Sequence, residues 1–171
     1  AGLEQRAIDA VETNVRAAGK HVRAYQRAVI QCATDAGREV LRTAADAFIA
    51  GVPRWPNKVM RQALQQALVR TDSAEFATED DAARELALRR LCVHAEILSA
   101  AATPPEDAGL RRERELELLR QGLGQARRMD DRDWEAMRLE WLCMGAVAPE
   151  VHDELERRFV QCLAGRRAGS N

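Results

Sequence analysis

Apolar residues recur every three or four positions along almost the whole chain, and this spacing limits what the chain can fold into. Leu88, Leu91, Cys92, Ala95 and Leu98 form one such stripe. Residues spaced in this way share one face of an α-helix, because the helix turns once every 3.6 residues. Glycine and proline, which break helices, are gathered at a few junctions. The pattern predicts an all-α fold of six to seven antiparallel amphipathic helices, in an irregular bundle or a short array of helical hairpins.

The junctions divide the chain into segments. Gly19 separates a helix over 3–18 from a longer one over 20–50, which the proline-rich stretch 51–57 ends. Asn57, Thr78 and Thr103 are expected to cap the next three helices, over 58–69, 78–102 and 103–128. Two more helices follow, over 130–145 and from Pro149 onward. We expect a single helical domain over 1–171, with long N-terminal helices over 1–57, central helices over 58–128, a C-terminal helix pair over 129–164 and a flexible tail over 165–171.

The overall charge provides no electrostatic case for nucleic-acid binding. Twenty-six Lys and Arg residues face 27 Asp and Glu residues, and the net charge is −1. Acids match bases in each part of the chain, so no segment is a basic arm or an acidic tail. The 46% of hydrophobic residues supports a packed core, and the 4% of aromatic residues argues against a sandwich or barrel. No uncharged stretch approaches the length of a membrane span, and no signal-peptide pattern opens the chain.

The four cysteines indicate a reducing compartment. They lie far apart, at 32, 92, 143 and 162, each among apolar residues. This is typical of reduced, buried thiols, so we expect a cytoplasmic protein. The first residue is not methionine and lies within a helical pattern, which indicates a fragment whose targeting signal could have been lost. Cys143, His152 and Cys162 could meet across the last two helices as a soft metal site, although no Cys-x-x-Cys pair supports one.

No catalytic motif is present. The sequence contains no phosphate-binding glycine loop, no zinc-protease motif and no serine-nucleophile motif. Glutamates at 113, 115 and 117 alternate with arginines, which favours a solvated face with ion pairs. We therefore expect a protein that is not an enzyme, with no catalytic residue, metal ligand, cofactor or small-molecule substrate.

Two tryptophans are candidates for binding a protein partner. Trp55 and Arg54 lie between two prolines in the stretch 51–57. A rigid loop that presents Trp55 could anchor a partner, or the ring could fold back over the helical core, which is the interpretation we favour. Trp141 is the second candidate, although it shares an apolar stripe with Trp134 and Met137.

Arginine doublets are the candidates for binding nucleic acid. Arg127 and Arg128 form one doublet, and Arg157 and Arg158 form another. A phosphate-binding stripe would result if the helices brought several doublets onto one face. Acidic neighbours favour instead a surface on which these arginines form ion pairs.

The C-terminal part of the chain resembles a bacterial helical repeat that is catalogued as domain of unknown function 349. The repeat pairs a helix ending in Trp with a Gly-Pro-Val-Pro turn and a helix containing Leu-Trp-x-x-Phe. The matching residues are Trp141, Gly145, Val147, Glu150, Asp153, Leu155, Arg158 and Phe159. Ala146, Ala148 and Glu156 stand where the pattern has two prolines and a second Trp. The resemblance implies that 129–164 is a degenerate final repeat.

A second stretch is similar to the region that precedes the end of these proteins. It comprises 91–98, Leu-Cys-Val-His-Ala-Glu-Ile-Leu, and 103–111, which begins Thr-Pro-Pro-Glu-Asp. The resemblance covers roughly residues 86–163 and implies the C-terminal domain of a multi-repeat helical scaffold. It implies no activity. Glu96 and Arg111 lie at similar distances from the Thr103 turn, and from this spacing we expect a buried or half-buried ion pair that holds a hairpin together.

These observations favour a helical interaction or scaffold domain that binds a protein, either a second copy or another subunit of an assembly. The alternative is a nucleic-acid-binding accessory domain that uses surface arginines. The first predicts an exposed apolar or Trp-bearing patch, and the second predicts arginines aligned on one face. A cysteine-based enzyme or metal site ranks third, and it predicts that cysteines converge with a histidine.

Overall fold

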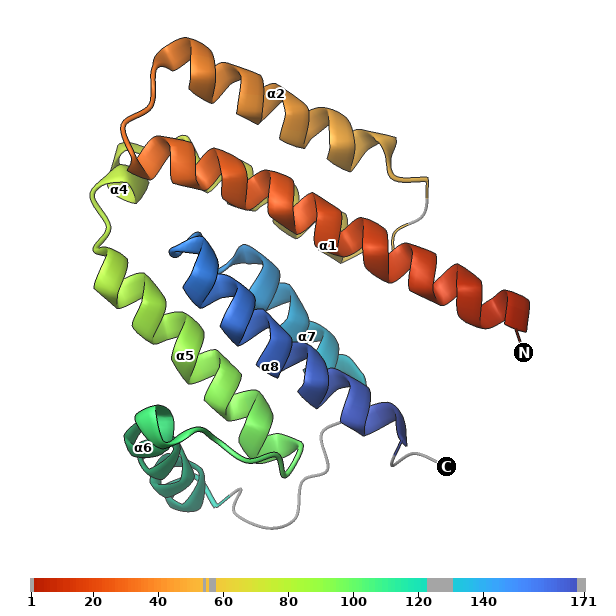
Figure 1. The fold of residues 1–171 in the computed structure, drawn as a ribbon, viewed down its shortest axis with the longest axis vertical. Coiled ribbons are helices and arrows are strands. Elements are labelled where there is room, and N and C mark those ends of the chain that lie inside the picture. The colour runs from red at the N-terminus through yellow and green to blue at the C-terminus, as the bar shows by residue number, and fades with distance from the viewer. Residues whose placement is uncertain (1, 54, 56–57, 123–130, 169–171) are drawn as a thin grey trace. The chain divides into compact units, whose positions relative to one another are not determined.

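The computed structural model describes residues 2–53, 55, 58–122 and 131–168. Within these residues the chain forms eight α-helices, one 3-10 helix and no strand, which confirms the all-α fold (Figure 1). The helices fall into two compact units, Ala1–Asp80 and Asp81–Asn171, here called unit 1 and unit 2. The sequence led us to expect one domain over 1–171, and the boundary between the units lies inside the segment 58–128.

Unit 1 is built on an antiparallel hairpin of two helices. Helix α1 (Gly2–Ile30) runs along α2 (Asp35–Gly51), and α3 (Lys58–Thr71) packs against both (Figure 1). A single turn, α4 (Ala74–Ala77), follows. The apolar stripes of these helices face one another, and the fully buried side chains include Val15, Val22, Ile49, Leu64 and Leu68.

The break between α1 and α2 is not at Gly19, so the predicted helices over 3–18 and 20–50 are wrong. Gly19 is buried inside α1, where packing outweighs the roughly 1 kcal/mol by which glycine disfavours a helix. The helix ends at Ile30, and Cys32 just beyond it has a φ of 53°. The amides of Cys32 and Ala33 bond back to Val29 and Ala28, as in a Schellman motif. Glycine is the usual residue at such a position, and its absence hid this helix end in the sequence.

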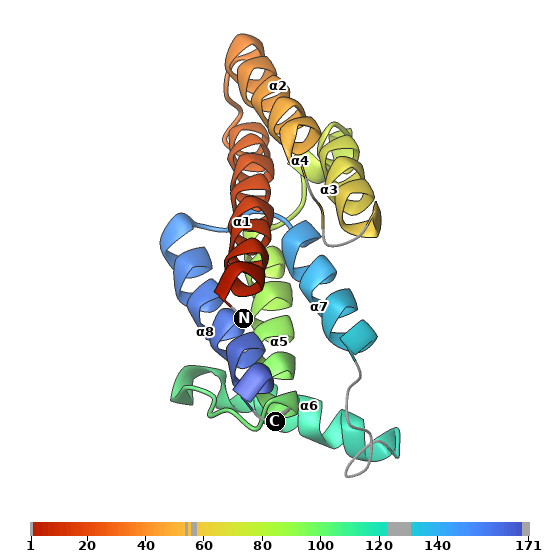
Figure 2. The ribbon, with the colours of Figure 1, turned by 90° about the vertical axis from the view of Figure 1, so that its right-hand side faces the viewer.

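The described residues of unit 2 form four α-helices. They are α5 (Asp81–Leu98), α6 (Ala108–Arg120), α7 (Asp131–Cys143) and α8 (Pro149–Ala168), with a 3-10 helix, η1 (Pro105–Asp107), before α6. The consecutive helices α7 and α8 run in opposite directions (Figure 2). Helices α5 and α8 lie side by side and parallel, because Cys92 contacts Leu155 and Glu96 contacts Arg158 one turn further along both helices. Long connections allow parallel neighbours, whereas short ones impose antiparallel pairs.

The core of unit 2 is aromatic. Trp141 and Phe159 stack with ring centroids 4.3 Å apart and ring planes within 5°. The stripe of α7 that includes Trp134 and Met137 packs there against α5 and α8, and all four side chains are buried. The stripes predicted for 88–95, 134–141 and 155–162 are therefore confirmed as core.

The spacing of Leu116, Leu119 and Leu123 predicts an inward apolar face for the helix over 103–128, and this prediction is wrong for α6. Leu116 and Leu119 are 48% and 62% exposed, and no residue of α6 is buried. The predicted third member, Leu123, lies outside the described residues. Within α6, Leu110, Arg111, Arg114 and Leu118 are only half-buried. The spacing predicted an apolar stripe but not whether a neighbouring helix would cover it.

Other helix ends also differ from the prediction. Thr103 does not cap a helix, because η1 follows Pro104 and its first turn has no side-chain cap. Thr78 ends α4, where its hydroxyl donates to the carbonyl of Glu75. Helix α8 continues to Ala168, so the predicted tail over 165–171 begins too early. Asn57 lies outside the described residues.

Candidate functional site

A buried ion network joins three elements of unit 2. Arg158 on α8 donates two hydrogen bonds to Glu96 on α5, of 2.8 and 3.2 Å, and one of 2.7 Å to Asp107 of η1. Side-chain exposure is 8% for Arg158, 3% for Glu96 and 4% for Asp107. Asp107 also accepts from Arg89 at 3.3 Å. The bidentate pair with Glu96 and the bonds that Asp107 accepts from two arginines supply the charged partners that buried carboxylates require.

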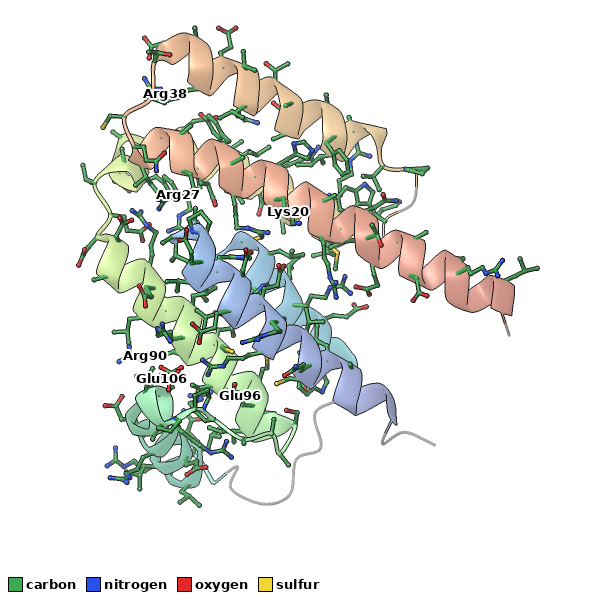
Figure 3. The ribbon with its side chains drawn as sticks, in the orientation of Figure 1. Lys20, Arg27, Arg38, Arg90, Glu96 and Glu106 are labelled. Carbon is green, nitrogen blue, oxygen red and sulfur yellow. The ribbon has the colours of Figure 1, made fainter. Side chains whose placement is uncertain are left out.

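The predicted pair of Glu96 and Arg111 is bridged by Thr103. The Thr103 hydroxyl donates to Glu96 at 2.7 Å and accepts from Arg111 at 2.9 Å. Arg111 also donates to the carbonyl of Ala101 and pairs with Glu115. The direct partner of Glu96 is thus Arg158, 62 residues away, which spacing around the Thr103 turn could not indicate. Figure 3 shows Glu96 toward the C-terminal end of α5.

The network sets the protonation of its neighbours. Burial opposes the charge of Arg158, but the hydrogen bonds that Arg158 donates to Glu96 and Asp107 outweigh burial, so the pKa of Arg158 is raised. Burial raises the pKa of Cys92 to about 12, and it also raises the pKa of Cys162. These two thiols are therefore protonated at neutral pH, whereas cysteine nucleophiles and metal ligands act as thiolates.

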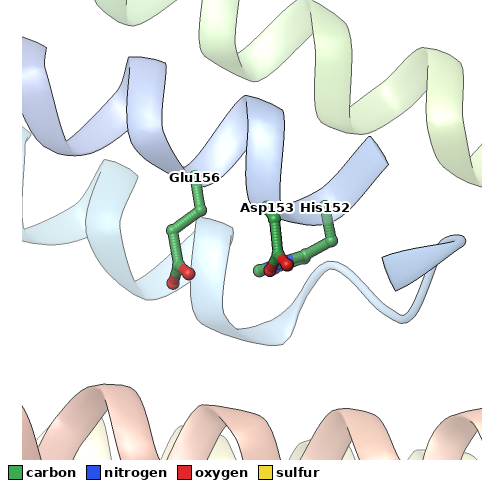
Figure 4. Close-up of side chains that lie close together, drawn as sticks. All are labelled: His152, Asp153 and Glu156. Atoms are coloured by element: carbon green, nitrogen blue, oxygen red, sulfur yellow. The ribbon is translucent and has the colours of Figure 1, made fainter. Parts of the chain in front are cut away.

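The predicted grouping of Cys143, His152 and Cys162 does not form a ligand set. In the part of the chain that the structure describes, the one group of three potential ligands within 4.8 Å is His152, Asp153 and Glu156 (Figure 4). All three lie on one stretch of α8. Side chains this close in sequence on one helix meet whether or not an ion is present, so the group does not indicate a metal site.

A cleft of about 810 Å³ opens beside α6 in unit 2. Its apolar lining includes Ala87 and Leu91 from α5, Leu110 and Leu116 from α6, and Met144 after α7. Charged side chains also line it: Arg90, Glu113, Arg114, Glu117, Arg120 and Glu140. An apolar surface with charged residues around it is typical of a site that receives an amphipathic helix.

His94 also lines the cleft, and it is neutral. Arg114 donates from Nε to His94 Nδ1 at 3.1 Å. Burial and the positive charge of Arg114 lower the pKa of His94 to about 4. Nothing in the spacing of His94 identified Arg114 as its neighbour.

The outer face of α6 combines exposed leucines with cations. Arg112 and Arg120 lie four residues before and after Leu116, so all three share one side of the helix. Neither arginine makes an ion pair with a side chain that the structure describes, whereas Arg111 and Arg114 pair with Glu115 and Glu117. The outward charges of α6 that lack an ion pair with a described side chain are therefore these two arginines.

The tryptophans predicted to bind a partner are less exposed than a surface anchor would be. Trp141 is 4% exposed and belongs to the core, so it is not a surface anchor. Trp55 is half-buried with a buried indole nitrogen, which fits the folded-back alternative. Arg54 lies outside the described residues.

Within the described residues of unit 2, the predicted arginine doublets do not form a phosphate-binding stripe. Arg157 is exposed, but Arg158 is engaged by Glu96 and Asp107 in the buried ion network. Arg127 and Arg128 lie outside the described residues.

Unit 1 has a smaller polar cluster where α1, α2 and α3 meet. Tyr25 donates to Asp72, which Arg42 also contacts at 3.1 Å. Arg42 lies over the Tyr25 ring, 5.8 Å from its centre. Burial and Asp72 raise the pKa of Tyr25 to about 12. These contacts connect helices to one another, so we assign the cluster a structural role.

Comparison with protein families, curated proteins and solved structures found no match for this chain. Among helices in the described residues, none is long and apolar enough to cross a membrane.

Proposed function

We propose that this chain is a helical protein-interaction module, and that its partner is an amphipathic helix with acidic flanks that docks along α6. The observation that carries the proposal is the uncovered leucine face of α6, with Leu116 48% and Leu119 62% exposed. Covering these two leucines would contribute on the order of 2 kcal/mol to the free energy of binding. Helix α6 has no buried residue of its own, so a partner would supply its main apolar contacts.

Charge selects the class of partner. Arg112 and Arg120 flank Leu116 and have no carboxylate partner among the described side chains. A partner helix that places apolar side chains against Leu116 and Leu119 would meet these arginines at its edges. Carboxylates there would be attracted, and lysines or arginines would be repelled. We therefore favour an acidic amphipathic helix over a second copy of α6, which would bring the same cations together.

The cleft beside α6 supports this role, because a docked helix could also contact Leu91 and Met144. A scaffold at the end of a multi-repeat protein, as the resemblance to domain of unknown function 349 implies, would use such a face to hold a second subunit. We also propose a reducing, cytoplasmic setting, consistent with the absence of disulfides among the four cysteines.

The test compares two matched double variants as bait for nuclease-treated cell extracts. Leu116→Asp with Leu119→Asp should lose a partner that the unchanged chain retains. Val59→Asp with Val69→Asp is the control, because these α3 valines are similarly exposed, at 57% and 64%. A partner that survives the α6 changes, or that disappears with nuclease, would contradict the proposal.

A second measurement establishes the chemistry of the partner. The helical segment of the recovered protein is made as a peptide and titrated by calorimetry against the chain and against its Arg112→Glu, Arg120→Glu variant. Binding should weaken with the variant and recover when the peptide's carboxylates are replaced by lysines. Binding that ignores both charge changes would rule out an acidic partner helix.

A further inference from the structure

A row of cations follows one side of α1 in unit 1. Arg16, Lys20, Arg23 and Arg27 are spaced by four, three and four residues. At about 100° per residue, their Cα atoms fall within an arc of about 60° and extend over about 16 Å. No acidic residue occurs between Glu12 and Asp35, so no carboxylate on α1 interrupts this row of cations. We call Arg16, Lys20, Arg23 and Arg27 the α1 row.

Unit 1 leaves this side of α1 free. His21 stacks on Phe48 of α2, and Tyr25 contacts Arg42 of α2, so α2 covers the side that carries His21 and Tyr25. That side lies about 130–170° around the helix from the centre of the α1 row. Figure 3 shows Lys20 and Arg27 on the side of α1 away from α2.

The cations of the α1 row are largely uncommitted. Arg16 and Lys20 are exposed and Arg27 is half-buried, and none of the three makes an ion pair with a described side chain. Arg23 is half-buried and has contacts of its own. Four like charges along three turns repel one another, so a bound anion would stabilise the helix as well as the complex.

The row is better placed than the cations of α3, a helix without an acidic residue. Lys58, Arg61 and Arg70 of α3 are spread over about 180° of its circumference, and Arg70 already pairs with Glu79. They cannot form a continuous line of positive charge. The α1 row does so without any change in the fold.

From these observations we propose that the α1 row binds the phosphate backbone of a nucleic acid without reading its sequence. A linear array of like charges over about 16 Å matches a polyanion whose charges repeat along a line, with one phosphate per about 3.4 Å of each strand. The α1 row lacks large apolar side chains, which a membrane-surface helix needs, because Val15, Val22 and Val29 are buried in the core. This inference is independent of the α6 face and does not rest on it.

The experiment measures binding of the full chain to a short fluorescein-labelled DNA duplex by anisotropy over a salt series. Three phosphate contacts, from Arg16, Lys20 and Arg27, predict an association constant that falls about 40-fold between about 50 and 200 mM salt. In the triple variant Arg16→Gln, Lys20→Gln, Arg27→Gln, affinity should fall about tenfold or more and the slope on log salt should flatten by about 3.

The control triple variant is Lys58→Gln, Arg61→Gln, Arg157→Gln. It removes the same number of positive charges from exposed positions outside α1. It should keep most of the affinity and the steep slope. Equal losses in the two triple variants would show binding to net charge alone and overturn the proposal. Circular dichroism establishes that each variant is folded, and the single variants Arg16→Gln and Lys20→Gln, at exposed positions, replace the triple variant if it unfolds.

Polyglutamate of equal charge separates nucleic acid from an acidic protein. It should displace the duplex far less well than unlabelled DNA. Equal displacement would overturn the assignment to nucleic acid, and no binding of the duplex at low salt would overturn the site altogether. Neither result affects the α6 proposal, because the partner capture is done after nuclease treatment and depends on Leu116 and Leu119.

Discussion

Replacing Arg158 by Met should destabilise unit 2 more than almost any other single change. The substitution removes the cation that faces both Glu96 and Asp107, which are 3% and 4% exposed. Leaving buried carboxylates without a partner costs about 3–5 kcal/mol. Arg89 remains near Asp107 and is only 20% exposed, so part of the charge stays balanced. We therefore expect a loss of about 4 kcal/mol, a large part of the stability of a domain this size.

The loss can be measured in unit 2 specifically. In a Trp55→Phe background, fluorescence during urea unfolding reports on Trp134 and Trp141, which are both buried in the unit 2 core. The control is Arg157→Met, the neighbouring exposed arginine, which should leave the midpoint unchanged. Arg158→Lys should lie between the two, because an ammonium keeps the charge but cannot form the bidentate pair.

A loss below about 1 kcal/mol in the Arg158→Met variant would refute the view that Arg158 compensates the two buried carboxylates.

Three further predictions follow from burial and electrostatics. Trp141→Ala should cost about 3–5 kcal/mol in urea unfolding, because it removes the ring stacked on Phe159, and a loss near zero would show that the stack is not part of the core. Iodoacetamide at pH 8 should alkylate exposed Cys32 while Cys92, whose pKa burial raises to about 12, is protected, so a Cys92 adduct on folded protein in mass spectra would contradict its burial. Imidazole NMR should show His94 titrating near pH 4, the pKa set by burial and Arg114, and Arg114→Gln should move its midpoint upward.

The His94 prediction also has a stability consequence. Its pKa of about 4 lies below the ordinary value of 6.5, so the unfolded chain binds a proton that the folded chain does not between these two values. Stability from this group is present above about pH 6.5 and is lost as pH falls toward 4. A His94→Gln variant should lose less stability on acidification over this range, and an unchanged acid profile would count against the assignment.

Helix ends were the least predictable part of the local structure. Helix α5 ends at Leu98, where the amides of Ala100 and Ala101 bond back to Ile97 and Glu96, and Ala100 has a φ of 56°. Helix α1 ends in the same way, with Cys32 just beyond Ile30. A glycine at either position would have marked the helix end in the sequence, but alanine and cysteine adopt this conformation only when the surrounding structure outweighs the steric cost. Gly19, by contrast, suggested an end that packing overrides.

The candidate sites also differ in how far they can be predicted from the sequence. The α1 row can be read from the sequence, because four cations at helical spacing without an intervening acid require no tertiary information. Counting charges over whole segments concealed it. The partner of Glu96 could not be found in this way, since Arg158 lies on a helix whose position beside α5 depends on packing. Likewise, the leucines of α6 were expected to be inside, and their exposure was not predictable from their spacing.

Apolar periodicity along this chain was sufficient to predict that helices form and which stripes make the core of each unit. That information lies in the order of neighbouring residues. The arrangement of the stripes was not encoded locally. Which helix covers which stripe depends on contacts between residues that are tens of positions apart, and their free energies are realised only when the whole unit packs. Long-range packing therefore made Arg158 a buried counterion and left α6 with an open face.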